Sequence, residues 1–582
     1  MANDYEATLA VAERVLTDAQ RDALVNGEDR LVTACPGAGK TRAVGARAAL
    51  LAAQGRRVAL TSYTNVGARE MREALERYFA VRLGDEHFVG TLHGYLLRFI
   101  FRPFGHTVMH CDREPGLRTS PSEEVVSVDG FQFNLDDFHF RPSGGLYFKG
   151  DRPSSCRIRN DDITLLGQDE ARRLKVKEAA AGVVSAEDAL FWSLQVLRSE
   201  GELCRAVAER FDEIIVDEAQ DTSAIQLECL RAIRAEGLRS LVLVGDFDQS
   251  IYSFHGASPD ACRRLASECG LVSVRLAENH RSSQLICNVA ATLRPGGEPD
   301  AAVGPDRDFP VPPTYFLYHP ADLASIPTEF AQRVGQHGAI LTESAVVART
   351  QGLVRALSGG GTRLKFSARS PVWGLLRAVG DRDGGLELAE VEGVERLLRD
   401  VVGNREEVVD AVEALRLRAA AMRTIEGLPV GEGVLDAWLN AAAAVVGDGA
   451  RELGASDPAA LVSNLLRIPQ RFHGENVRDL VPAGRADGVR IATVHGVKGM
   501  SLDAALLVAS PIEDWRGFEA DSWARIWQAV REGGTISAAD AEEARVLYVA
   551  VTRARRFCEV ALPSSTGADV LEAFEAAGLQ RA

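Results

Sequence analysis

The apolar residues of this chain gather in short runs, each of which ends in a polar or glycine-rich turn. The run "RLVTAC" (30–35) leads into a turn with two glycines, and the segment "TRAVGARAALLAAQG" that follows has helical composition. A second run, Ile214 to Val216, ends in Asp217 and Glu218, and similar runs occur in "LVLVG" and "VSVRL". Such runs are typical of buried parallel strands. The pattern predicts an α/β fold.

Two longer segments follow other periods. In "GFQFNLDDFHFRPSGGLYFKG" (130–150), bulky apolar residues alternate with polar ones, which predicts half-buried strands around a turn at "PSGG". The alternating residues are Phe131, Phe133, Leu135, Phe138 and Phe140. A segment that begins "AEVEGVERLLRDVV" instead has helical periodicity. We therefore expect one β-rich and one helical addition to the α/β core.

The stretch "TACPGAGKTR" has the arrangement of a P-loop. A strand, a glycine-rich turn and a GK[ST] sequence at a helix start can surround a triphosphate with backbone N–H groups. Lys40 would reach the β- and γ-phosphates, and Thr41 would ligate Mg²⁺. Ala34 stands where the first glycine is usual. Read alone, the stretch could also be a chance glycine turn before a surface helix.

The acidic pair after the second run supports the phosphate interpretation. A parallel strand that delivers two carboxylates at its C-terminal end suits the crevice where α/β folds bind ligands. Asp217 would hold Mg²⁺, and Glu218 would orient and deprotonate the attacking water. An acidic loop after a core strand is the alternative. Together with the P-loop, the pair predicts that the chain binds and hydrolyses ATP.

Further segments, in order along the chain, carry a resemblance to a known family. They are "LTDAQRDAL", "TACPGAGKTR", "FDEIIVDEAQDTS", "LVLVGDFDQSIYSFHGA", "LAENHRSS", "IATVHGVKGMSLDAALLVA" and "EEARVLYVAVTRARR". This series resembles the motifs of superfamily 1 helicases of the UvrD/Rep/PcrA type. The resemblance implies two RecA-like P-loop domains with ATP in the cleft between them.

The resemblance also assigns roles around the nucleotide. Gln20 would read the adenine edge and Gln249 would sense the γ-phosphate, while Arg281 and Arg553 would reach it from the second RecA-like domain. Without the motif context, either arginine would be taken for a surface residue. The implied catalytic residues are Lys40, Asp217, Glu218, Gln249, Arg281 and Arg553. The implied ATP-binding residues are Gln20, Ala34, Cys35, Pro36, Gly37, Ala38, Gly39, Lys40, Thr41, Arg42 and His280, with Mg²⁺ held by Thr41 and Asp217.

A second set of residues would grip single-stranded DNA by stacking and phosphate contacts. By resemblance these are Tyr63, Thr64, Asn65, Thr91, His93, Tyr252, Phe254, Arg349 and His495. Tyr63 stands where the family has a stacking phenylalanine. As alternatives, Tyr252 and Phe254 could pack as a hinge, and the two histidines could only position loops.

Several positions depart from the family pattern. His280 replaces a tyrosine that stacks on adenine, and His255 stands where the family often has arginine. The sequence "KGMSL" places Ser501 near a position where the family has a glutamate beside the ribose. These departures predict looser base selectivity and leave one ribose contact and one phosphate contact in question.

The motif positions predict four regions. The first RecA-like domain would comprise residues 1–101 and 183–275, interrupted by a β-rich insert at 102–182. The second would comprise 276–370 and 488–582, interrupted by a reduced helical insert at 371–487. The β-rich insert could be a small sheet that caps the adjoining domain, or a surface that binds duplex DNA or protein.

Composition changes this picture little. The chain has 582 residues, of which 46% are hydrophobic and 25% charged, and a net charge of −16. These proportions are ordinary for a globular protein. An acidic total argues mildly against nonspecific coating of nucleic acid, yet it permits a local basic channel. Nine scattered cysteines without a CxxC pair, no run of eighteen apolar residues and no secretory signal predict a cytoplasmic protein with reduced thiols and no membrane partner.

The sequence therefore predicts an ATP-dependent translocase and helicase on single-stranded DNA and its junctions with duplex DNA. By resemblance it would move 3′ to 5′ and serve DNA repair or antiviral defence. The alternative is a DNA-sensing ATPase that regulates or recruits a separate nuclease subunit, as in the Gabija anti-phage system. A self-contained helicase–nuclease is disfavoured because no nuclease-like cluster of acids and lysine follows the last motif.

Overall fold

The computed structural model describes residues 2–118, 122–150, 152, 155–199, 201–251, 259–294, 296–358, 370–381, 388–402, 411–468, 472–480, 485–486, 488–513, 517–534 and 536–582. The chain divides into two compact units. The first comprises Met1–His280 and Asp300–Val303, and the second comprises Arg281–Pro299 and Gly304–Ala582. Within the described ranges, no helix is long and apolar enough to cross a membrane.

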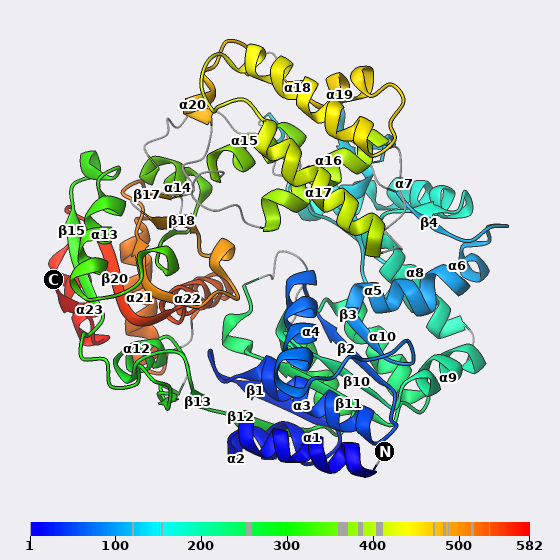
Figure 1. Ribbon diagram of the computed structural model, residues 1–582, viewed down its shortest axis with the longest axis horizontal. Coiled ribbons are helices and arrows are strands. Elements are labelled where there is room, and N and C mark those ends of the chain that lie inside the picture. Colours follow the sequence, from blue (N-terminus) through cyan, green and yellow to red (C-terminus); the bar gives the residue numbers. More distant parts are fainter. Residues whose placement is uncertain are drawn as a thin grey trace. The chain divides into compact units, whose positions relative to one another are not determined.

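The first unit is built on a parallel sheet of six strands in the order β12-β1-β11-β10-β2-β3 (Figure 1). The strands are β1 (Arg30–Ala34), β2 (Val58–Ser62), β3 (Phe88–Thr91), β10 (Glu213–Val216), β11 (Ser240–Gly245) and β12 (Val272–Leu276). Strands β2, β10 and β11 are buried along their whole length. The short apolar runs of the sequence are thus the central strands, as their composition predicted.

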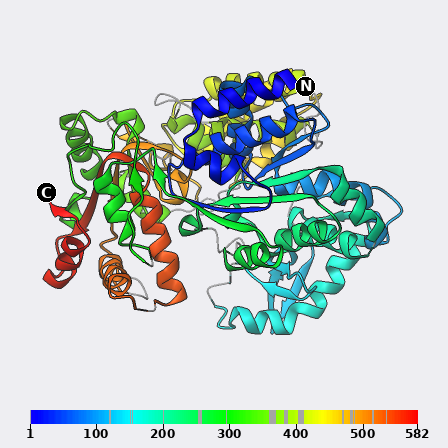
Figure 2. The ribbon, with the colours of Figure 1, turned by 90° about the horizontal axis from the view of Figure 1, so that it is seen from below.

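Helices cover both faces of this sheet, and the residues of each strand alternate between two cores. On β11, Leu241 and Leu243 pack on one side, while Val242 and Val244 pack on the other. One face carries α1 (Ala2–Val15), α3 (Lys40–Ala53) and α4 (Asn65–Phe79), drawn in blue in Figure 2. The other face carries α5 (Leu92–Leu96), α8 (Ala186–Ser199), α9 (Gly201–Arg210), α10 (Ala224–Ala235) and α11 (Pro259–Glu268). A parallel sheet covered on both sides leaves its strand ends as the accessible edge.

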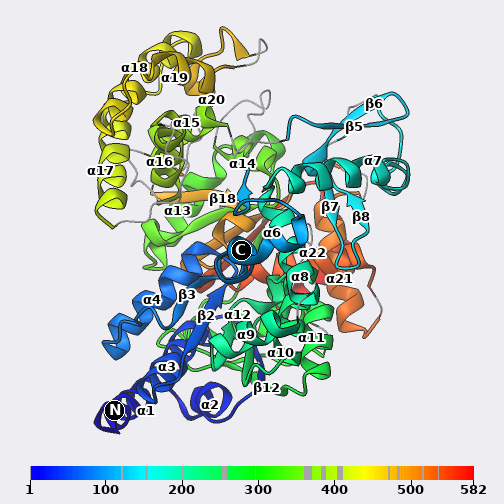
Figure 3. The same cartoon turned by 90° about the vertical axis from the view of Figure 1, so that its right-hand side faces the viewer.

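Short strands occupy the segment between α6 (Arg102–Met109) and α8, where the alternation of phenylalanines predicted them. Two antiparallel hairpins form there, β5 (Val125–Val128) with β6 (Phe131–Asn134) and β7 (Phe138–Phe140) with β8 (Leu146–Phe148). A third, parallel pair joins β4 (Gly116–Leu117) to β9 (Val183–Val184). The hairpins lie beside α7 (Asn160–Ala180) (Figure 3). Phe133, Phe138 and Phe140 are buried against it, so the period-2 interpretation of these residues is confirmed.

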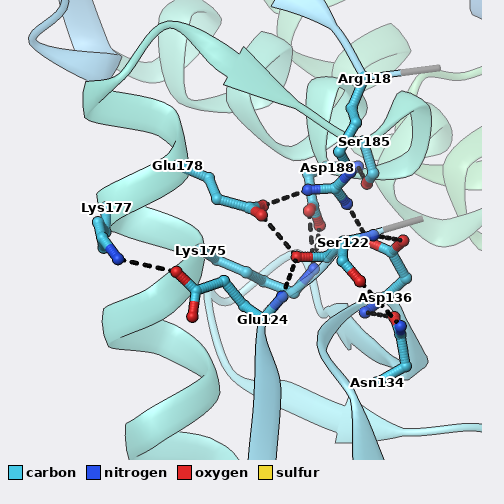
Figure 4. Close-up of polar contacts among 10 residues, drawn as sticks. All are labelled: Arg118, Ser122, Glu124, Asn134, Asp136, Lys175, Lys177, Glu178, Ser185 and Asp188. Atoms are coloured by element: carbon cyan, nitrogen blue, oxygen red, sulfur yellow. Dashed lines mark hydrogen bonds and ion pairs between the residues drawn. The ribbon is translucent and has the colours of Figure 1, made fainter. Parts of the chain in front are cut away.

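A polar network ties this segment to α7 and α8 (Figure 4). Arg118 pairs with Asp136 and with Glu178, the latter at 2.6 Å. The Lys175 ammonium donates to both carboxylate oxygens of Asp188, at 2.7 and 2.9 Å, and both side chains are buried. Because α7 carries Lys175 and α8 carries Asp188, this pair fixes the two helices to each other.

The second unit contains a sheet of seven strands in the order β17-β18-β16-β19-β20-β15-β21. All neighbouring strands are parallel except β17 and β18. The strands are β15 (Thr314–Tyr318), β16 (Ala345–Ala348), β17 (Arg485–Ala486), β18 (Val489–Thr493), β19 (Leu502–Val508), β20 (Ala554–Pro563) and β21 (Gln580–Arg581). The accompanying helices are α12 (Gln284–Ala291), α13 (Ile326–Gln336), α14 (Gln351–Leu357), α21 (Glu519–Arg531), α22 (Ala538–Val551) and α23 (Ala568–Ala576).

A set of helices with a core of its own lies between β16 and β17 in the sequence. They are α15 (Pro371–Asp381), α16 (Leu388–Val402), α17 (Ala411–Gly427), α18 (Leu435–Glu452), α19 (Ala459–Leu465) and α20 (Val477–Leu480). On α18, Trp438, Ala442, Val446 and Ala450 recur at helical spacing and are buried in this core. The helical periodicity of this region is confirmed.

Candidate functional site

The P-loop lies at the carboxyl end of β1, the strand between β12 and β11 in the first sheet. Strand β1 ends at Ala34, and α3 begins at Lys40, directly after Gly39 in the left-handed conformation (φ 73°). The backbone N–H of Cys35 donates to the Leu276 carbonyl oxygen at 2.9 Å, which ties the turn to the end of β12. The N-terminus of α3 thus points its free N–H groups at the turn, as a phosphate cradle requires.

Three side chains far apart in sequence meet beside this turn. The Gln20 amide is buried, and its Nε2 donates to the Ala38 carbonyl oxygen at 2.8 Å. Its Oε1 accepts from Arg42 Nη2 at 3.3 Å, and the His280 ring lies 3.5 Å from Gln20 Nε2. A Cβ on Gly39 would lie 2.6 Å from Gln20 Nε2, so this position requires glycine. The structure brings together three residues that the resemblance places near the adenine base.

The His280 ring is neutral near pH 7. Burial lowers its pKa, as does the Arg42 guanidinium, while Glu278 raises it by less. The His280 backbone N–H also donates to the Gly37 carbonyl oxygen at 3.0 Å. A neutral ring fixed to the P-loop suits stacking on a base, which the family achieves with tyrosine.

Carboxylates at the ends of β10 and β11 face the P-loop lysine. Asp217 follows β10 and Asp246 follows β11, and both are buried. Burial lowers the pKa of Lys40, but the carboxylates of Glu218, Asp246 and Asp217 raise it by more, so the ammonium stays charged. Burial raises the pKa of both aspartates above the ordinary range, and Lys40 opposes that rise. The single positive charge of Lys40 thus interacts with three acidic groups, Glu218, Asp246 and Asp217.

The two acidic residues that follow β10, Asp217 and Glu218, have different backbone conformations. The Asp217 N–H donates to the Thr61 carbonyl oxygen at 2.8 Å, which continues the pairing of β10 with β2. Glu218 adopts the left-handed conformation (φ 55°), which a non-glycine residue rarely takes. Such strain is typical of functional positions, because the surrounding structure must hold it.

Gln220 connects the two strand ends. Its Nε2 donates to the Glu218 carboxylate, and its Oε1 accepts the backbone N–H of Asp246 at 3.1 Å. A Cβ on Gly245 would lie 2.2 Å from this Oε1, so a larger residue there would displace the Gln220 side chain. Gln249 in turn donates from Nε2 to Asp246 at 2.8 Å. The sensor residue that the resemblance names is thus bonded to the carboxylate cluster.

These residues fit a nucleotide triphosphate with Mg²⁺. A backbone cradle and a lysine suit phosphate, and hydroxyl and carboxylate oxygens are the ligands that Mg²⁺ prefers. Thr41 on α3 and Asp217 directly after β10 would hold the ion, and when bound it would neutralise phosphate charge. Burial raises the pKa of Asp217 and of Asp246, so a cation bound beside them would stabilise their charged forms.

The expected DNA residues of the first unit lie at the ends of the two remaining strands. Tyr63, Thr64 and Asn65 directly follow β2, and Thr91 ends β3 with His93 after it. Thr64 and Thr91 cap helices, because their hydroxyls accept from Gly67 N–H at 3.0 Å and Gly94 N–H at 2.9 Å. Tyr63 and His93 are half-buried. One edge of one sheet thus carries the nucleotide residues in its middle and the candidate DNA residues at its side.

The second unit gathers its two candidate arginines at the end of α22. Arg281 Nη1 donates to the Thr552 carbonyl oxygen at 3.3 Å, and Arg553 follows Thr552 in the chain. The Arg553 side chain is buried and donates to the carbonyl oxygens of Val549 and Met500, each at 3.2 Å. The structure therefore brings together two residues that lie far apart in sequence.

The other candidate DNA residues have mixed placements. Arg349 follows β16 and pairs with the buried Glu543 at 2.9 Å, so a DNA phosphate would have to compete with this carboxylate. His495 is half-buried and follows β18. Tyr252, Phe254 and His255 lie outside the described residues.

Two residues of the nucleotide site were missed from the sequence. Asp246 follows the apolar run "LVLVG" as Asp217 follows its own run, and this repeated pattern was the available signal. Gln220 had no such signal, because its role depends on the distance between two strand ends.

The parallel sheet, the P-loop and the facing carboxylates define the P-loop class of α/β proteins. Within this class, residues 16–126 and 161–269 match the UvrD/REP helicase N-terminal domain. The match includes the P-loop and the carboxylates at the ends of β10 and β11, and it leaves out residues 127–160, which contain β6, β7 and β8.

Individual relatives agree with this match. The chain is 27% identical to DNA helicase II of Salmonella typhimurium over 293 residues, which cover 48% of this chain and 40% of that protein. It is 26% identical to ATP-dependent DNA helicase UvrD2 of Mycobacterium tuberculosis over 401 residues, 66% of this chain and 52% of that protein. It is 27% identical to ATP-dependent DNA helicase SRS2 of Saccharomyces cerevisiae over 334 residues, 49% of this chain and 28% of that protein. The matched part thus spans about half or less of each relative's length. The resemblance to UvrD-like superfamily 1 helicases is confirmed.

Proposed function

We propose that this chain is an ATP-dependent translocase on single-stranded DNA that unwinds duplex DNA. The observation that carries the proposal is the edge of the first sheet. There, Lys40 of the P-loop after β1 faces a carboxylate cluster at the ends of β10 and β11, while Tyr63 and His93 lie at the ends of β2 and β3. A site for a triphosphate and a set of stacking residues would therefore share one edge of one sheet.

The nucleotide residues would divide the work of hydrolysis. The Lys40 ammonium remains protonated and would hold the β- and γ-phosphates. Glu218 would accept a proton from the attacking water, and the Gln220 amide that donates to its carboxylate would help to orient it. Arg281 and Arg553 would stabilise charge on the γ-phosphate. Arginines in this role contribute roughly 10³ to 10⁵ in rate in other nucleotide hydrolases.

Coupling between hydrolysis and DNA would pass through the carboxylate cluster. Gln249 donates to Asp246, and Gln220 bonds to the Glu218 carboxylate and to the Asp246 backbone. A change of charge at the γ-phosphate would therefore alter bonds at the ends of β10 and β11, next to β2 and Tyr63. Two sites that bias one shared element are coupled in both directions.

Strand displacement is the experiment that tests this proposal. The purified chain, with ATP and Mg²⁺, is added to duplexes that carry a 3′ or a 5′ single-stranded tail. Unwinding only from the 3′ tail is expected, because the proposed direction along the tail is 3′ to 5′. ATP hydrolysis that single strands stimulate, without any unwinding, would instead favour the alternative of a DNA-sensing ATPase that acts with a separate nuclease. Absence of both activities would contradict the proposal.

A further inference from the structure

A cavity of about 410 Å³ lies in the first unit, beside the candidate DNA residues. Its walls are Tyr63 and His93, the hairpin β7–β8, the start of α8 and the first turn of α10. We call it the hairpin cavity. Its volume falls within the range of about 300–1,000 Å³ that is usual for ligand pockets. It thus extends the edge of the sheet toward a segment that carries none of the expected site residues.

The hairpin contributes aromatic and cationic groups to this cavity. Arg141, Tyr147 and Lys149 line it, and the Arg141 guanidinium lies 4.9 Å from the centre of the Tyr147 ring. The His139 and Tyr147 rings are 5.4 Å apart. Across the cavity, Tyr63 supplies a further ring. Aromatic rings beside cations on a groove are the combination that binds single strands without reading their sequence.

The walls are held rigidly. The Phe140 ring stacks on Phe191 of α8 at 3.9 Å between centroids, and the Lys175 ammonium lies 5.6 Å from the Phe140 ring centre. Lys175 in turn pairs with Asp188, which also lines the cavity. Because Lys175 neutralises Asp188, this carboxylate adds little negative charge to the cavity.

The carboxylate of Glu187 in the hairpin cavity would repel a phosphate. The Glu187 carboxylate lines the cavity and lies 2.5 Å from His139 Nδ1, with 62% of its side chain exposed. Arg141 and Lys149 outnumber it, so the cavity as a whole favours an anion. Because the charges of these groups have opposite signs, their removal should have opposite effects on the binding of a phosphate.

We propose that the hairpin cavity binds a nucleotide of single-stranded DNA. The base would lie against Tyr63 and Tyr147, and its phosphate would lie at Arg141 and Lys149. This inference rests on the proposed function, since it extends the strand path that begins at Tyr63. It assigns to β7–β8 a direct part in holding the strand.

The test is the affinity of the full chain for a fluorescent oligo-dT strand, measured by anisotropy over a range of salt concentrations. Arg141→Ala and Lys149→Ala should each weaken binding and reduce the slope of log affinity against log salt by about 0.7. Tyr147→Ala should weaken binding roughly 5- to 150-fold, and Tyr147→Phe should retain it. Arg173→Ala is the matched control, because Arg173 is an exposed cation of α7 outside the cavity.

Glu187→Gln separates an electrostatic role from a structural one. This variant keeps a polar group beside His139 and removes the negative charge, so it should bind the strand more tightly than the unmodified chain. A purely structural role would weaken binding in every cavity variant alike, and that result would overturn the proposal.

Two further outcomes are distinct from each other. If the unmodified chain binds oligo-dT and the Arg141, Lys149 and Tyr147 variants all bind like Arg173→Ala, the hairpin cavity is not part of the strand path and only this inference fails. The same holds if the variants lose affinity for blunt duplex DNA but keep it for oligo-dT. If the unmodified chain does not bind oligo-dT at all, the proposed function fails together with the inference.

Discussion

Two lysines of the first unit lie among carboxylates, and their surroundings differ in charge balance. Lys175 is buried and pairs with a single partner, Asp188, at 2.7 Å. Lys40 is only half-buried, and the field of Glu218, Asp246 and Asp217 raises its pKa. In the Lys175–Asp188 pair the positive and negative charges balance, whereas the cluster around Lys40 carries more negative than positive charge.

The difference shows how a structural ion pair can be told from a ligand site. A balanced, desolvated pair needs nothing further, and it fixes one helix to another. In the cluster, burial and then a neighbouring carboxylate raise the pKa of Asp217 and of Asp246, and a cation that joins them would favour their charged forms. A nucleotide with Mg²⁺ supplies such a cation and also the phosphates for Lys40. The excess of acids therefore marks the nucleotide site independently of its sequence motif.

The largest effect is expected from the proposed general base. Glu218→Gln should lower the rate of ATP hydrolysis by roughly 10²- to 10⁴-fold, since general bases contribute about this factor, while ATP binding is retained. Turnover and the binding of a fluorescent ATP analogue would be measured together. Glu73→Gln, an exposed change on α4, serves as the control. Unchanged turnover in the Glu218 variant would show that Glu218 is not the general base.

Breaking the balanced pair should cost stability. Lys175→Met should lower the free energy of unfolding by about 3–5 kcal/mol, because it leaves the buried Asp188 charge without a partner. Lys177→Met, which removes an exposed lysine paired with Glu124, should cost about 1 kcal/mol or less. Urea denaturation measures both. Equal stability of the two variants would show that the Lys175 pair does not hold α7 to α8.

Removing the other lysine should act on ligand binding before stability. Lys40→Met should weaken ATP binding roughly 10- to 150-fold, the value of a charge-assisted hydrogen bond. Its destabilisation should be smaller than that of Lys175→Met, because Lys40 is only half-buried, whereas Lys175 is buried with its single partner Asp188. Isothermal titration and urea denaturation would be compared. A larger loss of stability for Lys40→Met than for Lys175→Met would show that Lys40 contributes more to folding than Lys175 does.

The smallest effect is a dependence of stability on pH. Burial raises the pKa of Asp246 to about 7 in the folded chain, against about 3.9 when unfolded. The folded state therefore binds more protons than the unfolded state between these values, so the contribution of Asp246 to stability is present below pH 4 and is lost as the pH rises through 7. Asp246→Asn should flatten the fall in unfolding free energy between pH 5.5 and pH 8, measured without nucleotide. An unchanged pH profile would contradict the assigned shift.

Much of the nucleotide site could be predicted because its residues directly follow strands. Parallel strands end at one edge, so an apolar run followed by a glycine turn or by Asp-Glu places those groups together. Phe133, Phe138 and Phe140 likewise revealed their strands by alternation, and the segment "AEVEGVERLLRDVV" revealed α16 by helical spacing.

The hairpin cavity could not be predicted in this way. Its walls come from five separate segments, and Arg141 and Tyr147 carry no motif. Gln220 and the pairing of Arg349 with Glu543 depend on distances that no local pattern records. A site formed at the ends of neighbouring strands is therefore readable from sequence, whereas one formed by packing of distant segments is not.

The most direct test of the central claim is the rate of ATP hydrolysis by the purified chain as oligo-dT is added. We expect a strong rise in rate, with Glu218→Gln inactive at every DNA concentration and Tyr63→Ala requiring more DNA for half of the rise. A rate that does not change with single-stranded DNA, in a chain that hydrolyses ATP, would contradict the claim that one sheet edge couples the nucleotide to the strand.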